Sequence, residues 1–216
     1  GHGWSRTSRS LAPDTVILID THYDNYSFSE LESCWEHELC EVSCPACTSV
    51  GAFALHGRYA KYYYHERINI LRVRCRQCWV THALIPGFSL PGTSGGTEEV
   101  ESYLIKRDSG DGRKTASEAF TDLGVSAQYP KQLDLMLATA VSRAKALFPD
   151  AADDRLSGLE WIQAAAGEKE RPLWALNRYA LGHQYNCICF CRASIITFSS
   201  TTASRASSHN RGSPDR

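Results

Sequence analysis

Long apolar segments are missing from this sequence. No run approaches the roughly 20 apolar residues that a membrane-spanning helix needs. The apolar run at residues 16–19 is too short for the core of a secretory signal peptide. We therefore expect no membrane partner and a reducing, cytoplasmic compartment, in which paired cysteines favour metal binding over disulfide formation.

Positive charge is missing from a long stretch near the N-terminus. No Lys or Arg occurs between Arg9 and Arg58, whereas eight acidic residues fall there: Asp14, Asp20, Asp24, Glu30, Glu32, Glu36, Glu38 and Glu41. Blocks of like charge usually stay solvated, so residues 1–41 are expected to be an acidic leader, ordered at most around residues 16–19. The chain has 216 residues and a formal net charge of −1, which allows one ordinary domain or two small ones.

Four of the nine cysteines form two C-x-x-C pairs, with 27 residues between the pairs. Each pair places two thiolates on one tight turn, and two turns complete a tetrahedral set of sulfur ligands. The pattern predicts one zinc ion bound by Cys44, Cys47, Cys75 and Cys78. Because protein would fill all four positions, we expect a structural role and no hydrolytic chemistry. Iron in a rubredoxin-like site is the other option.

The residues between the two cysteine pairs predict a β-hairpin. Residues 51–64 and 67–75 are rich in Tyr, Val and Ile, and residues 79–84 could add a third strand. Prolines and glycines at residues 86–96 then predict a linker. Residues 42–90 are therefore expected to form a zinc ribbon.

Cations and tyrosines are interleaved along the predicted hairpin: Arg58, Tyr59, Lys61, Arg67, Arg72, Arg74 and Arg76. In the second strand Arg72 and Arg74 fall on one face, while Val73 and Cys75 fall on the other and can pack inward. Guanidinium groups bind phosphates and tyrosines stack on bases, so these residues are predicted to contact DNA. The alternative is a β-ribbon whose charged outer face serves only solubility.

Residues 97–148 predict a helical unit. A first helix is expected near residues 98–107, and a second ends at Gly124. A third helix follows, with Ser126 as a possible N-cap. Helix, glycine turn and helix give the outline of a helix-turn-helix. Lys131 is the cation placed early enough in the third helix to contact DNA, although a plain packing role is equally consistent with the pattern.

Capping residues divide residues 150–184 into two short helices. The expected boundary residues are, in chain order, Asp153 or Asp154, Gly167, Pro172 and Gly182. Residues 185–216 become rich in Ser, Thr and Arg, and predict a mostly disordered tail.

The remaining cysteines match no specific ligand spacing, and ordinary thiols are favoured over a second metal site. They are Cys34, Cys40, Cys187, Cys189 and Cys191. His82 lies four residues after Cys78, where it could contact the metal site or simply pack.

Several segments together resemble a family of small bacterial proteins of unknown function: Cys44-Pro-Ala-Cys47, His56-Gly57-Arg58-Tyr59, Arg72-Val73-Arg74-Cys75-Arg76-Gln77-Cys78 and Thr81-His82-Ala83-Leu84-Ile85-Pro86. That family is similar to the N-terminal zinc-binding and helix-turn-helix region of insertion-sequence transposases. The resemblance covers about half the chain, residues 44–147. It implies a zinc ribbon with the four cysteines as ligands, followed by a DNA-binding helical unit. Thr48 and Trp79 stand where the family pattern has glycine after each cysteine pair.

The sequence thus predicts an α+β chain with a zinc ribbon, a helix-turn-helix-like unit and disordered ends. Its expected function is zinc-dependent DNA binding without catalysis, in the cytoplasm and at the nucleoid if DNA is bound. A protein-interaction adaptor and a transposase remnant are the alternatives. Phosphoryl-transfer enzymes need clustered carboxylates to hold Mg²⁺, and the acids after residue 148 fall on short helical segments. No small-molecule substrate is indicated.

Overall fold

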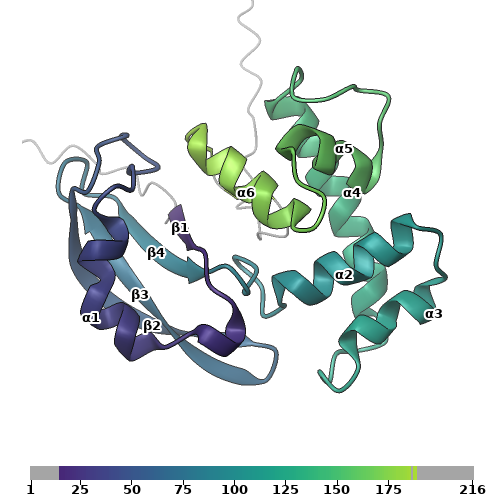
Figure 1. Ribbon diagram of the computed structural model, residues 1–216, viewed down its shortest axis with the longest axis horizontal. Coiled ribbons are helices and arrows are strands. Elements are labelled where there is room, and N and C mark those ends of the chain that lie inside the picture. The colour runs from purple at the N-terminus through teal and green to yellow at the C-terminus, as the bar shows by residue number, and fades with distance from the viewer. Residues whose placement is uncertain (1–14, 186, 189–216) are drawn as a thin grey trace, which may run out of the picture.

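The computed structural model describes residues 15–185, 187 and 188 of the chain. The expectations for residues 1–14, for Cys189 and Cys191 and for the rest of the tail lie outside the described residues. Figure 1 shows a mixed α+β protein, with the sheet and helix α1 on one side and the other helices beside them. No helix in the described part is both long and apolar enough to cross a membrane.

The sheet has four strands in the order β1-β4-β3-β2. Their bounds are β1 (Thr15–Ile19), β2 (Phe53–Tyr63), β3 (Glu66–Cys75) and β4 (Thr81–Pro86). The predicted hairpin is confirmed, because β2 and β3 pair antiparallel around a two-residue turn at Tyr64 and His65. The predicted third strand is β4, antiparallel to β3, whereas β1 adds to β4 in parallel.

The segment expected to be a solvated leader contributes more than one short strand. After β1 and a 3-10 turn, η1 (Tyr23–Asn25), it forms helix α1 (Phe28–Leu39), which lies across one face of the sheet (Figure 1). Leu31 and Leu39 are buried and Trp35 is half-buried, so one stripe among the glutamates is apolar. The expectation of order only near residues 16–19 was wrong, because the excess of acidic charge concealed that stripe.

The predicted linker is buried. Phe88 is 1% exposed and packs with Ile70 and Ile85, on the face of the sheet opposite α1. Leu90, also 1% exposed, belongs to the core of the helical unit. Residues 86–96 therefore join the two parts of the protein through apolar contacts on both sides.

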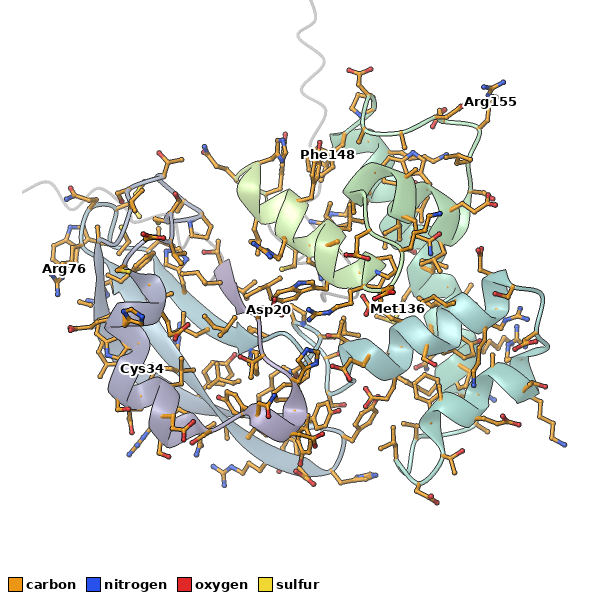
Figure 2. All side chains as sticks on the ribbon, in the orientation of Figure 1. Asp20, Cys34, Arg76, Met136, Phe148 and Arg155 are labelled. Carbon is orange, nitrogen blue, oxygen red and sulfur yellow. The ribbon has the colours of Figure 1, made fainter. Side chains whose placement is uncertain are left out.

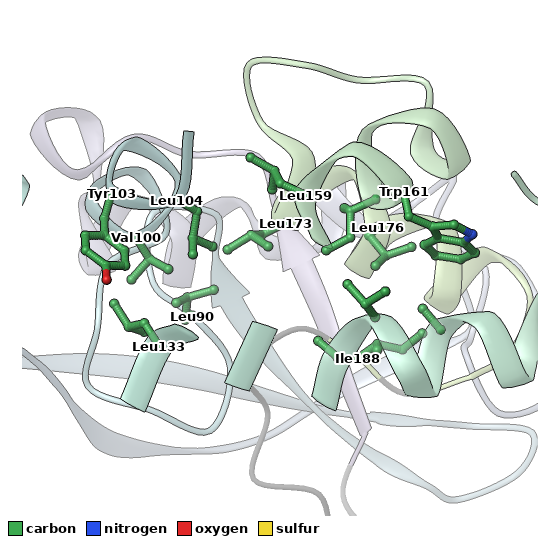
Figure 3. Close-up of a cluster of buried hydrophobic side chains, with 14 of the residues drawn as sticks. Leu90, Val100, Tyr103, Leu104, Leu133, Leu159, Trp161, Leu173, Leu176 and Ile188 are labelled. Carbon is green, nitrogen blue, oxygen red and sulfur yellow. The ribbon is translucent and has the colours of Figure 1, made fainter. Parts of the chain in front are cut away.

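The helical unit encloses one apolar core, which Figure 3 shows. Its elements are α2 (Thr97–Asp108), α3 (Arg113–Ala116), η2 (Ser117–Phe120), α4 (Tyr129–Leu147), α5 (Gly158–Ala166) and α6 (Pro172–Gly182). Val100, Leu133 and Leu176 bring α2, α4 and α6 together in that core. Whether α2 to α4 act as a helix-turn-helix stays a prediction.

Most predicted helix ends are confirmed, but the end at Gly124 and two N-terminal caps are not. The predicted second helix is divided into α3 and η2 and ends at Phe120. Gly167 ends α5 at a φ of 69°, and α6 spans Pro172–Gly182 as expected. The N-cap of α4 is Gln128 instead of Ser126. The N-cap of α5 is Ser157 instead of Asp153 or Asp154, and Asp153 pairs with Arg155 in the preceding turn at 2.6 Å.

Candidate metal centre

Four cysteine sulfurs meet beside the sheet. The Sγ atoms of Cys44, Cys47, Cys75 and Cys78 all lie within 4.8 Å of one another. The Sγ–Sγ distances are 3.7 Å from Cys44 to Cys78 and 3.7 Å from Cys47 to Cys75. Zinc bound to sulfur at about 2.3 Å gives tetrahedral sulfur–sulfur edges of about 3.8 Å. The four cysteines can therefore hold one metal ion without a large rearrangement.

The two C-x-x-C turns have the same main-chain hydrogen bonds. In the first, Cys44 N–H donates to Ser49 O at 2.9 Å and Thr48 N–H donates to Cys44 O at 2.8 Å. In the second, Cys75 N–H donates to Val80 O at 2.9 Å and Trp79 N–H donates to Cys75 O at 3.0 Å. Two sequence-distant turns with one geometry form a matched pair of ligand loops.

The residue after each cysteine pair is left-handed. Thr48 has a φ of 63° and Trp79 has a φ of 65°. Glycine adopts this conformation without strain, whereas an L-residue with a Cβ atom pays about 1–2 kcal/mol. Both turns keep the geometry despite lacking glycine, so the surrounding contacts must offset that cost.

Hydrogen bonds to sulfur favour thiolates at part of the site. Burial would raise the pKa of Cys75, but the Ser49 hydroxyl and the N–H groups of Cys78 and Gln77 lower that pKa to about 6. Burial raises the pKa of Cys44 to about 12. Ala46 N–H and Gln77 N–H each point to a ligand sulfur at 3.4 Å. A bound divalent cation would deprotonate all four thiols, since only thiolates ligate.

His82 supports the site from outside the four sulfurs. Its side chain is completely buried on β4, and Nε2 lies 3.3 Å from Cys44 Sγ. Its Nδ1 contacts Thr15 Oγ1 of β1, so one imidazole connects the first strand to a ligand sulfur. The sequence had two interpretations for His82, a contact with the metal site or plain packing. Thr15 and Ser49 were missed because a lone hydroxyl has no diagnostic spacing.

The predicted DNA-contacting residues are divided between the two faces of the sheet. Residues paired across strands share a face, and Arg58 pairs with Leu71 whereas Tyr59 pairs with Ile70. The face toward α1, called the α1 face, carries Arg58 and Arg67. The opposite face carries Tyr59, Lys61, Arg72 and Arg74.

Several of these cations already have partners. Arg58 NH1 lies 3.5 Å from Glu32 Oε1 of α1, an exposed pair. Lys61 Nζ donates to Ser89 Oγ at 2.6 Å and to Thr93 O, which ties β2 to the buried connector. Lys131 is exposed on the first turn of α4. Acidic α1 therefore neutralises part of one face.

Arg72 and Arg74 lie on the opposite face, and the residues paired with them on the neighbouring strands are small. Across the adjoining strands Arg72 faces Gly57 and Ala83. In the same way Arg74 faces Ala54 and Thr81. Arg76 follows them at the end of the sheet farthest from the helical unit, as Figure 2 shows.

The other described thiols form no further ligand set. Cys34 is half-buried and Cys40 exposed at the C-terminal end of α1, while Cys187 is buried. Among residues 15–185, 187 and 188, the four cysteines of the two turns are the one group of at least three potential ligands close enough to hold a metal.

No family model, no curated protein and no solved structure matches this chain.

Proposed function

We propose that this chain is a non-catalytic DNA-binding module, related to the transposase region it resembles and stabilised by structural zinc. The separation of charge across the sheet is the observation that carries the proposal. Acidic α1 covers one face, whereas the half-buried Arg72 and Arg74 lie on the opposite face between small residues, with Arg74 NH2 3.2 Å from His56 Nε2. A polyanion can approach that face without meeting the glutamates of α1.

Zinc has a positioning role in this proposal. The second C-x-x-C turn continues directly from β3, so the metal fixes the end of the strand that bears Arg72 and Arg74. With four sulfur ligands no coordination position is left for a reacting water. Sulfur ligands in a tetrahedral set favour zinc over harder cations.

The proposal is tested by the salt dependence of duplex affinity. The slope of log affinity against log salt is about −0.9 for each phosphate contact in duplex DNA. Arg72→Ala and Arg74→Ala should each reduce the steepness of that slope by about 1. Arg155→Ala is the control, because Arg155 is exposed on a loop far from the sheet (Figure 2).

Two results would reject the proposal. One is the absence of duplex binding by the zinc-loaded chain at low salt. The other is a slope that the two sheet variants and Arg155→Ala change equally, since binding would then not involve the opposite face.

A further inference from the structure

A groove follows the free edge of the hairpin. The cavity has a volume of about 640 Å³ and is lined by four consecutive residues of β2, 59–62. Successive side chains of a strand point to opposite faces, so a cavity that touches four in a row reaches the strand from its edge. Strand β2 is the last in the sheet order, and this edge carries no further strand in the described part of the chain.

The main chain of this edge is oriented for pairing. In a two-residue hairpin the residues that flank the turn, here Tyr63 and Glu66, form a hydrogen-bonded pair, and bonded and non-bonded pairs then alternate. Arg58, Ala60 and Tyr62 consequently direct their N–H and C=O groups outward.

A contact on β3 agrees with this orientation. Asn69 is the partner of Ala60, and its carbonyl accepts a hydrogen bond from Tyr26 Oη at 2.6 Å, away from β2. On the free edge, the carbonyl of Tyr62 has a long contact with Lys61 Nζ at 3.4 Å. The bulge between Leu55 and Gly57 interrupts the earlier part of the strand. The open pairing edge is therefore short, from Arg58 to Tyr62.

The rest of the groove mixes apolar and uncharged polar side chains and lacks acids. Residues 129, 132, 133 and 136 of α4 form the wall opposite β2, and Leu90, Gly92, Thr93 and Ser94 of the connector complete the lining. No carboxylate lines the cavity, whereas Lys61 does, and exposed Arg58 and Lys131 adjoin the lining residues.

We propose that this groove binds an extended segment of a partner protein, which adds to β2 as a fifth strand. Main-chain bonds to Arg58, Ala60 and Tyr62 would hold the segment, as in other cases of strand addition. An apolar side chain would enter between Tyr59 and Met136, and flanking acidic side chains would complement Lys61 and Lys131. Outward main-chain groups at every second residue match a peptide backbone, which is why a peptide is favoured over a nucleic acid strand. The groove includes Tyr59 and Lys61 of the opposite face, but neither Arg72 nor Arg74 lines it.

The probe is an eight-residue peptide in which valine and glutamate alternate, added to the zinc-loaded full-length chain. Binding should slow amide hydrogen exchange at Arg58, Ala60 and Tyr62. The amides of Tyr59 and Lys61 already bond to β3 and should be protected before and after addition. Two N-methylated peptides should behave differently. Methylation of the alternate nitrogens that bond to β2 should abolish binding, and methylation of the other nitrogens should not.

Two variants on one helix separate groove binding from loss of folding. Met136→Glu places a carboxylate in the groove and should weaken peptide binding at least tenfold. Leu135→Glu is the matched control, since Leu135 is 65% exposed and does not line the cavity, and should leave the affinity within twofold.

The inference is overturned if no peptide binds at millimolar concentration, or if peptide binds without protecting the three amides. It is also overturned if a single-stranded oligothymidylate protects those amides and the peptide does not. Arg72→Ala should leave peptide affinity within twofold while it weakens duplex binding, so each hypothesis can fail without the other.

Discussion

The sheet and the helical unit are stabilised in different ways. Among the described residues, the core of the helical unit contains eighteen buried residues in one cluster. The buried residues of the sheet are divided into clusters of nine and six on its two faces, and Cys44 and Cys75 are members of the larger one. Small apolar cores seldom suffice alone, and structural metals often supplement them.

Contacts between the two parts are polar as well as apolar. Tyr63 Oη donates to Glu99 Oε1 at 2.9 Å, and Arg171 NH1 lies 2.8 Å from Asp20 Oδ1. In Figure 2 Asp20 lies between the sheet and the helices. Because the apolar clusters of the sheet are smaller than the core of the helical unit, metal loss should disrupt the sheet first. The helical unit should respond mainly to changes in its own core.

The largest expected effect comes from the metal ligands. Cys75→Ser should abolish stoichiometric zinc binding and unfold the sheet, because structural zinc contributes roughly 10–16 kcal/mol in small domains. The far-ultraviolet signal of the helices should largely remain. Elemental analysis and amide exchange measure the two effects, and Cys40→Ser, at an exposed thiol, is the control. A wild-type chain that folds fully without metal would contradict this expectation.

The next effect should be confined to the helices. Leu176→Ala removes a fully buried side chain from α6 and should cost about 2–5 kcal/mol of unfolding free energy. Zinc content should not change. Denaturant unfolding followed by helix ellipticity measures the loss, with Leu135→Ala as the exposed counterpart. Simultaneous loss of zinc would show that the two parts unfold as one.

A pH dependence is expected at the start of α6. Glu101 Oε1 accepts hydrogen bonds from Leu173 N–H at 2.9 Å and Trp174 N–H at 3.0 Å. Burial raises the pKa of Glu101 to about 7, although those bonds and Arg171 oppose the rise. Because the folded-state pKa exceeds the unfolded value, stability should fall as pH rises from about 4.5 to about 7, by at most about 3 kcal/mol.

Urea unfolding at several pH values checks this expectation. Glu101→Gln should remove most of the slope in that window, whereas Glu160→Gln, at an exposed position of α5, should keep it. If the unfolding free energy of Glu101→Gln still falls over this pH range, the pH dependence arises from other groups.

The smallest effect concerns the cysteine turns. Thr48→Gly should raise the unfolding free energy of the zinc-loaded chain by about 0.5–1 kcal/mol, because glycine relieves the left-handed strain. Ala46→Gly in the same turn should lower it, since Ala46 is not left-handed. Thermal unfolding in excess zinc measures the stability of both variants. If the two substitutions change the stability equally, the strain at Thr48 is already compensated.

The sequence was most informative where short-range patterns control the structure. The cysteine pairs, the hairpin and the α6 boundaries at Pro172 and Gly182 depend on spacing and backbone preference, and the structure has them. Helix α1 was missed because four glutamates are interspersed among its apolar residues. The buried connector was missed because prolines and glycines also occur in packed turns.

The distribution of the predicted DNA-contacting residues could not be derived from the sequence. Alternation places Arg72 and Arg74 on one face, as predicted. The face of Arg58 depends on strand register, and a bulge beside His56 shifts that register by one residue. Nothing local in the sequence indicates that α1 supplies Glu32 as a partner for Arg58.

The parallel pairing of β1 with β4 has a consequence for the order of folding. Thr15 and His82, which touch beside the metal site, are 67 residues apart in the chain. Closing so long a loop is entropically costly, whereas the β2–β3 hairpin closes locally. During synthesis β1 emerges first and must wait for β4 before it can pair. We therefore expect the cysteine turns to capture their metal early, and the first strand to dock last over a site already loaded.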